Sequence, residues 1–235
     1  MFTMVKHESR DDDQHSLTGF GVAGAVAIIL LSVAFSSEAY SQTATMQHVA
    51  AKQQIRSGKT LQTSAALRDL WVGHIFWVRN VSIAAMDNND AALKASEQQA
   101  VANAKSIAAS IEPFYGADAK EAFFKLLAGH YGAIKAYLLA TVGGTASAQA
   151  AATQSLTSNA EDITVFLSKA NPHLPKDTLG SLLLAHGSHH IQQIQELKAR
   201  NYAAEAKTWE DMKNHVYQIA DATADALTKQ YPEQF

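Results

Sequence analysis

Cysteine is absent from the 235-residue chain, and proline and net charge are both low. Without a thiol, neither a disulfide framework nor a thiolate metal site can form. Four prolines leave long stretches free to be helical, and a net charge of −3 gives no basic surface for nucleic acid. What the sequence does contain is ten histidines. Any metal site must therefore use nitrogen or oxygen ligands, with methionine sulfur as the one soft donor.

The amino-terminal part carries a targeting pattern. Residues 20–35 are an uninterrupted run of apolar and small side chains. A membrane span needs roughly 20 such residues and a signal-peptide core roughly 7–15, so the run fits a signal peptide better. The acidic residues at 11–13 are untypical of a signal leader, and a retained anchor is the alternative. We expect residues 1–41 to be the targeting segment and residues 42–60 a polar spacer. The rest is then periplasmic or extracellular, and tied to the inner membrane only if residues 20–35 are uncleaved.

The remaining residues, 61–235, contain an internal repeat. Three blocks of equal length, 61–116, 117–172 and 173–228, align without gaps. Two columns of the alignment hold polar residues: His74, His130 and His186 in the first, and Asn103, Asn159 and His215 in the second. Several columns that coincide at one constant offset indicate a threefold repeat.

Each block is expected to form two helices. Apolar side chains recur at i, i+3, i+4 and i+7, which is the spacing of one helix face. Helix breakers stand within the blocks at 87–90, 143–145 and Asn201, and between them at 113–116 and 171–175. The prediction is an all-α fold, an antiparallel bundle of about six helices built from three αα-hairpins. The terminal blocks are as apolar as the middle one, unlike the water-facing ends of a solenoid, so we expect a single closed domain.

In such a bundle the two polar columns fall at the same height. Together they form one layer across an otherwise apolar interior: His74, Asn103, His130, Asn159, His186 and His215. Buried polar groups cost a few kcal/mol each unless they are paired, so this layer needs partners.

One interpretation of the layer is a metal site. Three imidazoles from His74, His130 and His186 would suit Zn or Cu and would leave a fourth position open. His186 and His190 are spaced i, i+4 on one helical face and are the best candidate ligands. Further candidates are His215, from the partner helix, and His189. The amides of the second column, Asn103 and Asn159, would then orient the ligand rings from a second shell.

Two other interpretations stay open. The layer can instead be a hydrogen-bonded network that only fixes helix register in a structural or interaction module. A non-covalent heme held by axial histidines is a third. The sequence has no HExxH motif, no glycine-rich phosphate loop and no GxSxG elbow, so it identifies no catalytic residue, and a binding protein is favoured over an enzyme. Beyond a metal ion, no partner is indicated.

Some segments resemble a family of exported bacterial helical-bundle proteins without an established activity. They are Leu70-Trp71-x-x-His74-x-x-Trp77-x-Arg79, Asn103 with Pro113-Phe114-Tyr115-Gly116, and Asn159-Ala160-Glu161-Asp162-Ile163 with Asn171-Pro172. The resemblance covers residues 67–232 and implies an exported helical fold without assigning a catalytic residue. Several members carry an acidic residue before the first histidine, where this chain has Gly73.

Overall fold

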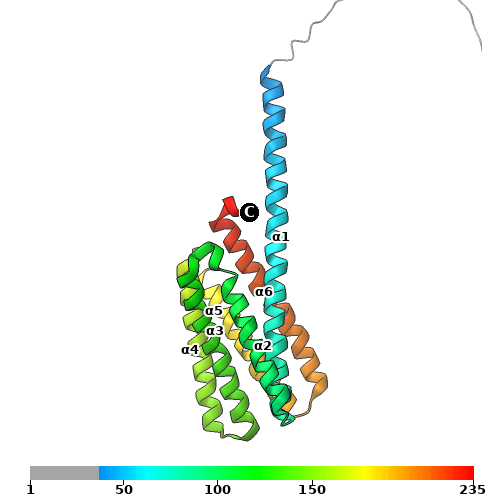
Figure 1. Cartoon of the computed structure of the whole chain (residues 1–235), viewed down its shortest axis with the longest axis vertical. Coiled ribbons are helices and arrows are strands. Elements are labelled where there is room, and N and C mark those ends of the chain that lie inside the picture. Colours follow the sequence, from blue (N-terminus) through cyan, green and yellow to red (C-terminus); the bar gives the residue numbers. More distant parts are fainter. Residues whose placement is uncertain (1–36) are drawn as a thin grey trace, which may run out of the picture. The chain divides into compact units, whose positions relative to one another are not determined.

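The computed structural model describes residues 37–235, with side chains from residue 58 onward and that of Met46. These residues form six α-helices and one short 3-10 helix, with no β-strand among them (Figure 1). The helices are α1 (Ser37–Met86), α2 (Asp90–Ala109), α3 (Glu112–Gly143), α4 (Ala146–Ala170), α5 (Lys176–Lys198), α6 (Tyr202–Gln230) and η1 (Pro232–Gln234). The all-α prediction is confirmed. The apolar run at 20–35 lies outside the described residues, and none of the described helices combines the length and apolarity that a bilayer crossing requires.

Most helix ends lie where the sequence places breakers. The side chains of Asn89, Thr145 and Asn201 accept hydrogen bonds from backbone N–H groups at the starts of α2, α4 and α6. Gly116 interrupts α3 near its start with φ 83°, a conformation that favours glycine. α1 is longer than predicted, at 50 residues, and is helical through 42–60. The reason is that no proline or glycine stands between Ser37 and the glycine at 58.

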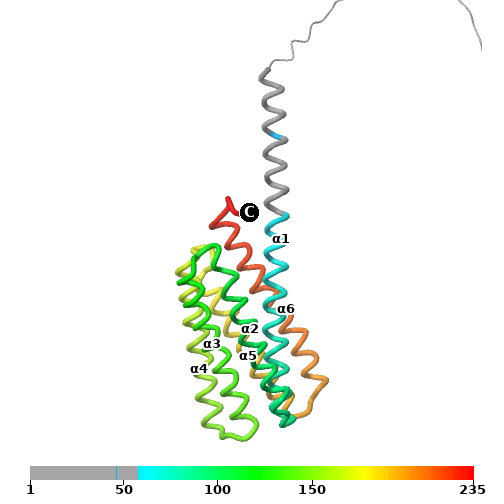
Figure 2. The backbone as a smooth tube through the Cα atoms, viewed as in Figure 1, coloured from blue at the N-terminus to red at the C-terminus, as the bar shows by residue number. Residues whose placement is uncertain are grey.

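The helices of residues 45–235, which form one compact unit, close into a bundle. Consecutive helices from α2 to α6 pack against each other, and antiparallel hairpins such as α3–α4 are visible in Figure 2. α6 returns to α1, where Thr60 hydrogen-bonds Thr228 and Asp221 accepts from both Ser64 and Arg68. α3 also contacts α5 across the bundle. Closure therefore holds, and an open solenoid is excluded for the described helices.

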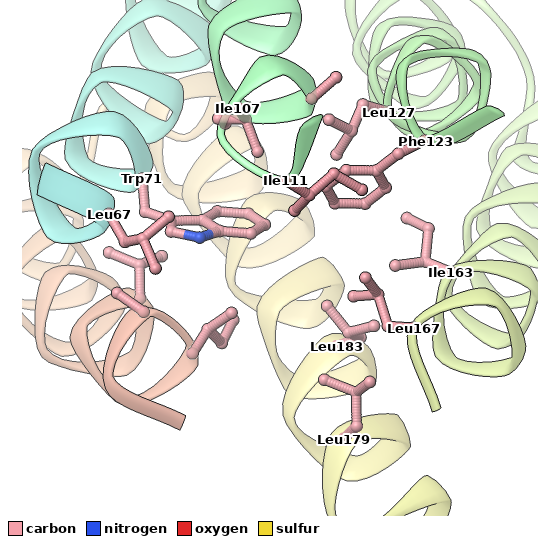
Figure 3. Packing of buried hydrophobic residues seen from close by; sticks show 14 of the residues in the cluster. Leu67, Trp71, Ile107, Ile111, Phe123, Leu127, Ile163, Leu167, Leu179 and Leu183 are labelled. Carbon is pink, nitrogen blue, oxygen red and sulfur yellow. The ribbon is translucent and has the colours of Figure 1, made fainter. Parts of the chain in front are cut away.

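The buried apolar side chains form two clusters that are separated along the helices. On α1 one cluster contains Trp71 and Ile75 and the other Val78 and Val81. Figure 3 shows part of the first cluster, to which all six helices contribute side chains. Its labelled members are Leu67, Trp71, Ile107, Ile111, Phe123, Leu127, Ile163, Leu167, Leu179 and Leu183. The histidines of the odd-numbered helices lie between the two clusters, so apolar packing encloses them from both ends.

Candidate metal centre

Four histidines meet in the middle of the bundle. His74 comes from α1, His130 from α3, and His186 and His190 from consecutive turns of α5. Their exposed fractions are 6%, 4%, 1% and 1%, so all four are buried. The three helices bring them together because each histidine follows the apolar face of its helix and faces the bundle interior.

The four rings are arranged almost as a regular tetrahedron. One ligand atom from each ring lies within 4.8 Å of the other three. The six distances between ring centroids run from 4.6 Å for the His186–His190 pair to 5.9 Å for the His130–His190 pair. Four imidazoles around one Zn²⁺ with Zn–N bonds of about 2.05 Å would have their centroids about 5.2 Å apart. The observed rings already bracket that separation.

The nitrogens of these rings are poorly satisfied by hydrogen bonds. Within the described part of the chain, His74 Nε2, both nitrogens of His130, and the Nδ1 atoms of His186 and His190 are buried without a partner. The one hydrogen bond inside the group joins His186 Nε2 and His190 Nε2 at 3.2 Å. Two imidazole ligands of a tetrahedral Zn²⁺ hold their nitrogens about 3.3 Å apart, so this contact also matches a shared metal.

Burial keeps the four rings neutral. Desolvation lowers the pKa of His74 to about 3, with a further contribution from repulsion by His130. Desolvation also lowers the pKa of His130 to about 4, against a smaller opposing effect from the nearby Asn159 side chain. The pKa values of His186 and His190 fall well below the ordinary value for the same reason, reinforced by the neighbouring histidines. Neutral imidazole is the form that binds a metal ion.

The predicted asparagine column lies beside the group and is anchored to the backbone. Asn103 Nδ2 donates to the carbonyl of Leu70, and Asn159 Nδ2 donates to the carbonyl of Leu126, each at 3.0 Å and across 33 residues of sequence. The Oδ1 atoms of both amides are buried without a partner in the described part of the chain. Both amides therefore keep an unused acceptor atom.

Two glycines make room for these amides. A Cβ atom at position 73 would lie 2.8 Å from Asn103 Nδ2, and one at position 129 would lie 3.0 Å from Asn159 Nδ2. Gly73 and Gly129 immediately precede His74 and His130. The sequence analysis assigns no role to these glycines. Their signal is that both stand one residue before the histidine, at equivalent positions of the first two blocks.

His215 and His189 lie next to the group of four and outside it. His215 Nε2 donates to the Leu182 carbonyl at 2.8 Å, again across 33 residues, and so makes the bond that the two asparagines make. The same hydrogen bond therefore occurs once in each of the three sequence blocks. The threefold repeat itself stays a prediction. Three histidines with an open fourth position were expected, and the structure instead groups His190 with them as a fourth. The i, i+4 spacing places it beside His186.

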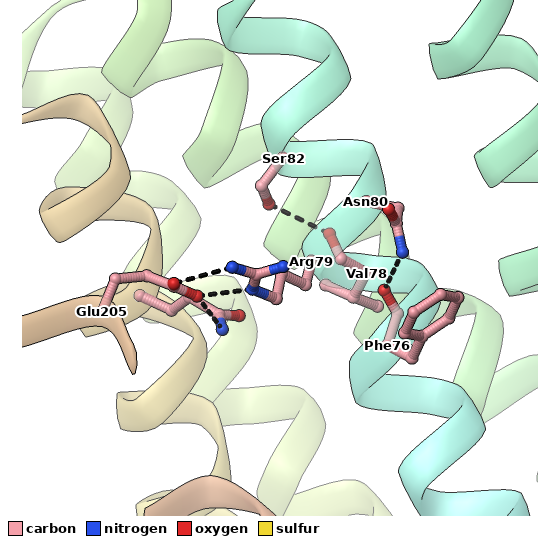
Figure 4. A network of polar contacts seen from close by, with 7 residues as sticks. Phe76, Val78, Arg79, Asn80, Ser82 and Glu205 are labelled. Atoms are coloured by element: carbon pink, nitrogen blue, oxygen red, sulfur yellow. Dashed lines mark hydrogen bonds and ion pairs between the residues drawn. The ribbon is translucent and has the colours of Figure 1, made fainter. Parts of the chain in front are cut away.

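A partly buried ion pair one turn beyond the histidines is not predicted by the sequence analysis (Figure 4). Arg79 of α1 donates to both carboxylate oxygens of Glu205 on α6, at 2.6 and 2.8 Å, and Gln193 of α5 donates to the same carboxylate at 2.9 Å. Glu205 is 2% exposed. The pair fixes α1, α5 and α6 against each other near the ligands, and no spacing rule connects residues 79 and 205.

No protein-family model matches the chain, and neither does a curated protein or a solved structure. The resemblance to exported bacterial helical proteins stays a prediction.

Proposed function

We propose that this protein binds a metal ion through His74, His130, His186 and His190. The observation that carries the proposal is the buried group of four imidazoles whose ligand atoms lie within 4.8 Å of one another. Five of their ring nitrogens have no hydrogen-bond partner among the described residues. An ion at the centre would bind one nitrogen of each ring. These bonds would offset the free-energy cost of burying ring nitrogens without hydrogen-bond partners.

The arrangement favours Zn²⁺ over Cu²⁺. A square-planar ion would place its four ring centroids on a square, with two diagonals about 1.4 times longer than the edges. Here the opposite pairs that would be the diagonals, His130–His190 and His74–His186, are 5.9 and 5.5 Å apart, while the other four distances run from 4.6 to 5.8 Å, so no such ratio is present. Tetrahedral nitrogen coordination is the geometry of Zn²⁺, while Cu²⁺ prefers tetragonal sites.

Four protein ligands define the kind of function that the site supports. Catalytic zinc keeps an open position for water or substrate, whereas four protein ligands close the coordination sphere. The group of four contains no carboxylate. We therefore favour metal binding or handling over hydrolysis, and an exported location follows only if the predicted targeting segment functions as such.

The amides of Asn103 and Asn159 suit the role of outer partners. Their Oδ1 atoms, unpaired among the described residues, can accept the N–H of a ligand ring whose other nitrogen binds the ion. Asn159 lies close enough to His130 to affect its pKa. Such partners fix the tautomer and orientation of a ligand imidazole.

The two alternative interpretations find less support. A hydrogen-bonded packing layer should satisfy its own polar atoms, yet His74 Nε2 and the Nδ1 atoms of His186 and His190 are buried without a partner among the described residues. A heme with two axial histidines needs room for the porphyrin plane between the two rings. Whichever two of the four histidines are chosen, the other two rings lie within 5.9 Å of them, which leaves little room for a porphyrin.

The test is a calorimetric titration of chelator-treated protein with Zn²⁺, with Cu²⁺ in a parallel experiment. We expect saturable binding of one Zn²⁺ per chain, and its loss in the double variant His186→Ala/His190→Ala. Circular dichroism of that variant checks that the helices persist. Absence of saturable binding by the wild-type protein would overturn the proposal.

A further inference from the structure

A line of three imidazoles leads from the surface of the bundle to the buried group. His215 of α6 lies parallel to His186, with an interplanar angle of 9° and 6.4 Å between ring centroids. His189 of α5 contacts His215 edge-on, with 5.2 Å between centroids. Both are only half-buried, whereas His186 is 1% exposed. The two outer rings thus stand between solvent and one of the candidate ligands.

The hydrogen bond that His215 makes does not require a histidine. Its partner, the Leu182 carbonyl, can only accept, so His215 Nε2 carries a hydrogen and Nδ1 is the ring nitrogen that this bond does not use. Asn103 and Asn159 make the corresponding bond with an amide. The imidazole therefore adds a metal-binding nitrogen that the structural contact leaves unused.

His189 is likewise particular to the third block. The equivalent residues of the second and first blocks are Ala133 and Trp77, neither of which can bind a metal. His189 Nδ1 is a buried atom without a hydrogen-bond partner in the described part of the chain. His189 and His215 are thus two neighbouring imidazoles with unused nitrogens, and they lie at the outer end of the line of three rings.

We propose that His189 and His215 form an outer, two-histidine site that receives the divalent ion and passes it to His186. This inference rests on the proposed function of the buried group. Two imidazoles, with water completing the coordination, bind Zn²⁺ more weakly than four, so the ion moves inward to the better site. The ring of His215, which lies parallel to His186 with 6.4 Å between centroids, connects the outer site to the buried group.

A competing route would pass Gly187. A pocket of about 90 Å³ lies there between α4 and α5, lined by Leu156, Leu183 and Ser188 among others. Its lining holds no histidine or carboxylate among the described residues, and its only side-chain oxygens are hydroxyls, so it offers an ion neither an imidazole nor a carboxylate ligand on its way inward. An ion that entered by that route would be indifferent to changes at His189 and His215.

The experiment compares the rate of metal loading with the final state. The double variant His189→Ala/His215→Asn reproduces the residues of the second block, and the asparagine keeps the bond to the Leu182 carbonyl. Metal-free wild-type and variant proteins are mixed with Co²⁺ in a stopped-flow instrument, and the visible absorption of four-coordinate Co²⁺ is followed. His173→Ala, a histidine in the loop before α5, is the control for simple loss of a histidine.

We expect the variant to load about tenfold more slowly, with unchanged stoichiometry and final spectrum. This factor is the lower end of the roughly 10- to 100-fold effect that removing an outer partner has on the affinity or activity of a metal site. Equal loading rates would overturn the outer site and favour the Gly187 route. A changed final spectrum or stoichiometry would overturn it too, because the two residues would then belong to the final site. Wild-type protein that develops no Co²⁺ absorption at all would instead contradict the proposed function.

Discussion

His186 Nε2 and His190 Nε2 lie 3.2 Å apart in the middle of the bundle, on consecutive turns of one helix. The neighbouring His189 points to another partner, His215, with 5.2 Å between their ring centroids. Two adjacent residues of α5 therefore belong to different environments, and substitutions at them should have different consequences.

The first prediction uses this adjacent pair. His190→Ala removes a direct ligand and should lower Zn²⁺ affinity at least about 100-fold, more than the loss of an outer partner does. His189→Ala should leave the equilibrium affinity within error of the wild type. Competition titrations against a chromophoric chelator measure both. Equal losses in the two variants would show that the group of four has the wrong fourth member.

A second prediction concerns the metal-free protein. Both nitrogens of His130 are buried without a partner among the described residues, which costs about 1–3 kcal/mol per unsatisfied group. In chelator-containing buffer, His130→Leu should therefore match or exceed the wild type in its free energy of unfolding. With Zn²⁺ present, the wild type should gain stability and the variant should gain none. Urea unfolding with and without Zn²⁺ gives these values.

The packing hypothesis makes the opposite forecast for His130→Leu. If the ring served only to fix helix register, its removal would destabilise the metal-free protein, and Zn²⁺ would affect neither form. Unfolding curves of that kind would favour a structural module.

The third prediction is a pH dependence of the metal-free protein. The four histidines have folded-state pKa values below their ordinary 6.5, so the unfolded chain binds more protons as the pH falls past that value. The free energy of unfolding is therefore highest above pH 6.5. It decreases on acidification and stops decreasing once the pH is below the folded-state pKa values. For His74 and His130 these are about 3 and 4.

Four such groups cost up to about 5 kcal/mol per pH unit, a large part of the stability of an ordinary domain. Urea unfolding at pH 7.5, 6.5 and 5.5, with chelator, measures the slope. His74→Leu/His130→Leu should reduce it by about half. A free energy of unfolding that stays constant between pH 7.5 and 5.5 would contradict burial of the neutral rings.

A fourth prediction concerns the two kinds of glycine in these helices. Gly132→Ala adds a Cβ that meets nothing within 4 Å, so the better helix propensity of alanine should stabilise the protein by up to about 1 kcal/mol. Gly73→Ala puts a Cβ 2.8 Å from Asn103 Nδ2, which forces the amide away from the Leu70 carbonyl. The variant should then unfold more easily than Gly132→Ala by about 1–2 kcal/mol. Thermal unfolding of both variants decides this, and equal Tm values would show that the Asn103 contact is dispensable.

Much of the fold was predictable because helix periodicity and breakers are local signals. The caps at Asn89, Thr145 and Asn201 stand where the sequence marks helix ends. The layer followed from one further step, since antiparallel hairpins bring mid-helix residues to equal height. The sequence analysis underestimates the length of α1, because polar composition is typical of a spacer, although no proline or glycine stands between residue 37 and the glycine at 58.

The site was predictable in its members more than in its geometry. The column shared by the three blocks identifies His74, His130 and His186, and the i, i+4 spacing ranks His190 ahead of His215. Neither signal gives the distances among the rings, because these depend on the rotation of the helices about their axes, which long-range packing sets. The ion pair of Arg79 with Glu205 joins residues far apart in sequence and left no periodic trace.

The most direct test of the metal centre is X-ray absorption spectroscopy of the Zn²⁺-loaded protein. Four nitrogen ligands at about 2.0 Å, with the multiple scattering of imidazole rings, are expected for His74, His130, His186 and His190. In His130→Leu the number of imidazoles should fall to three. A first shell dominated by oxygen, or a spectrum unchanged in His130→Leu, would contradict a four-histidine site.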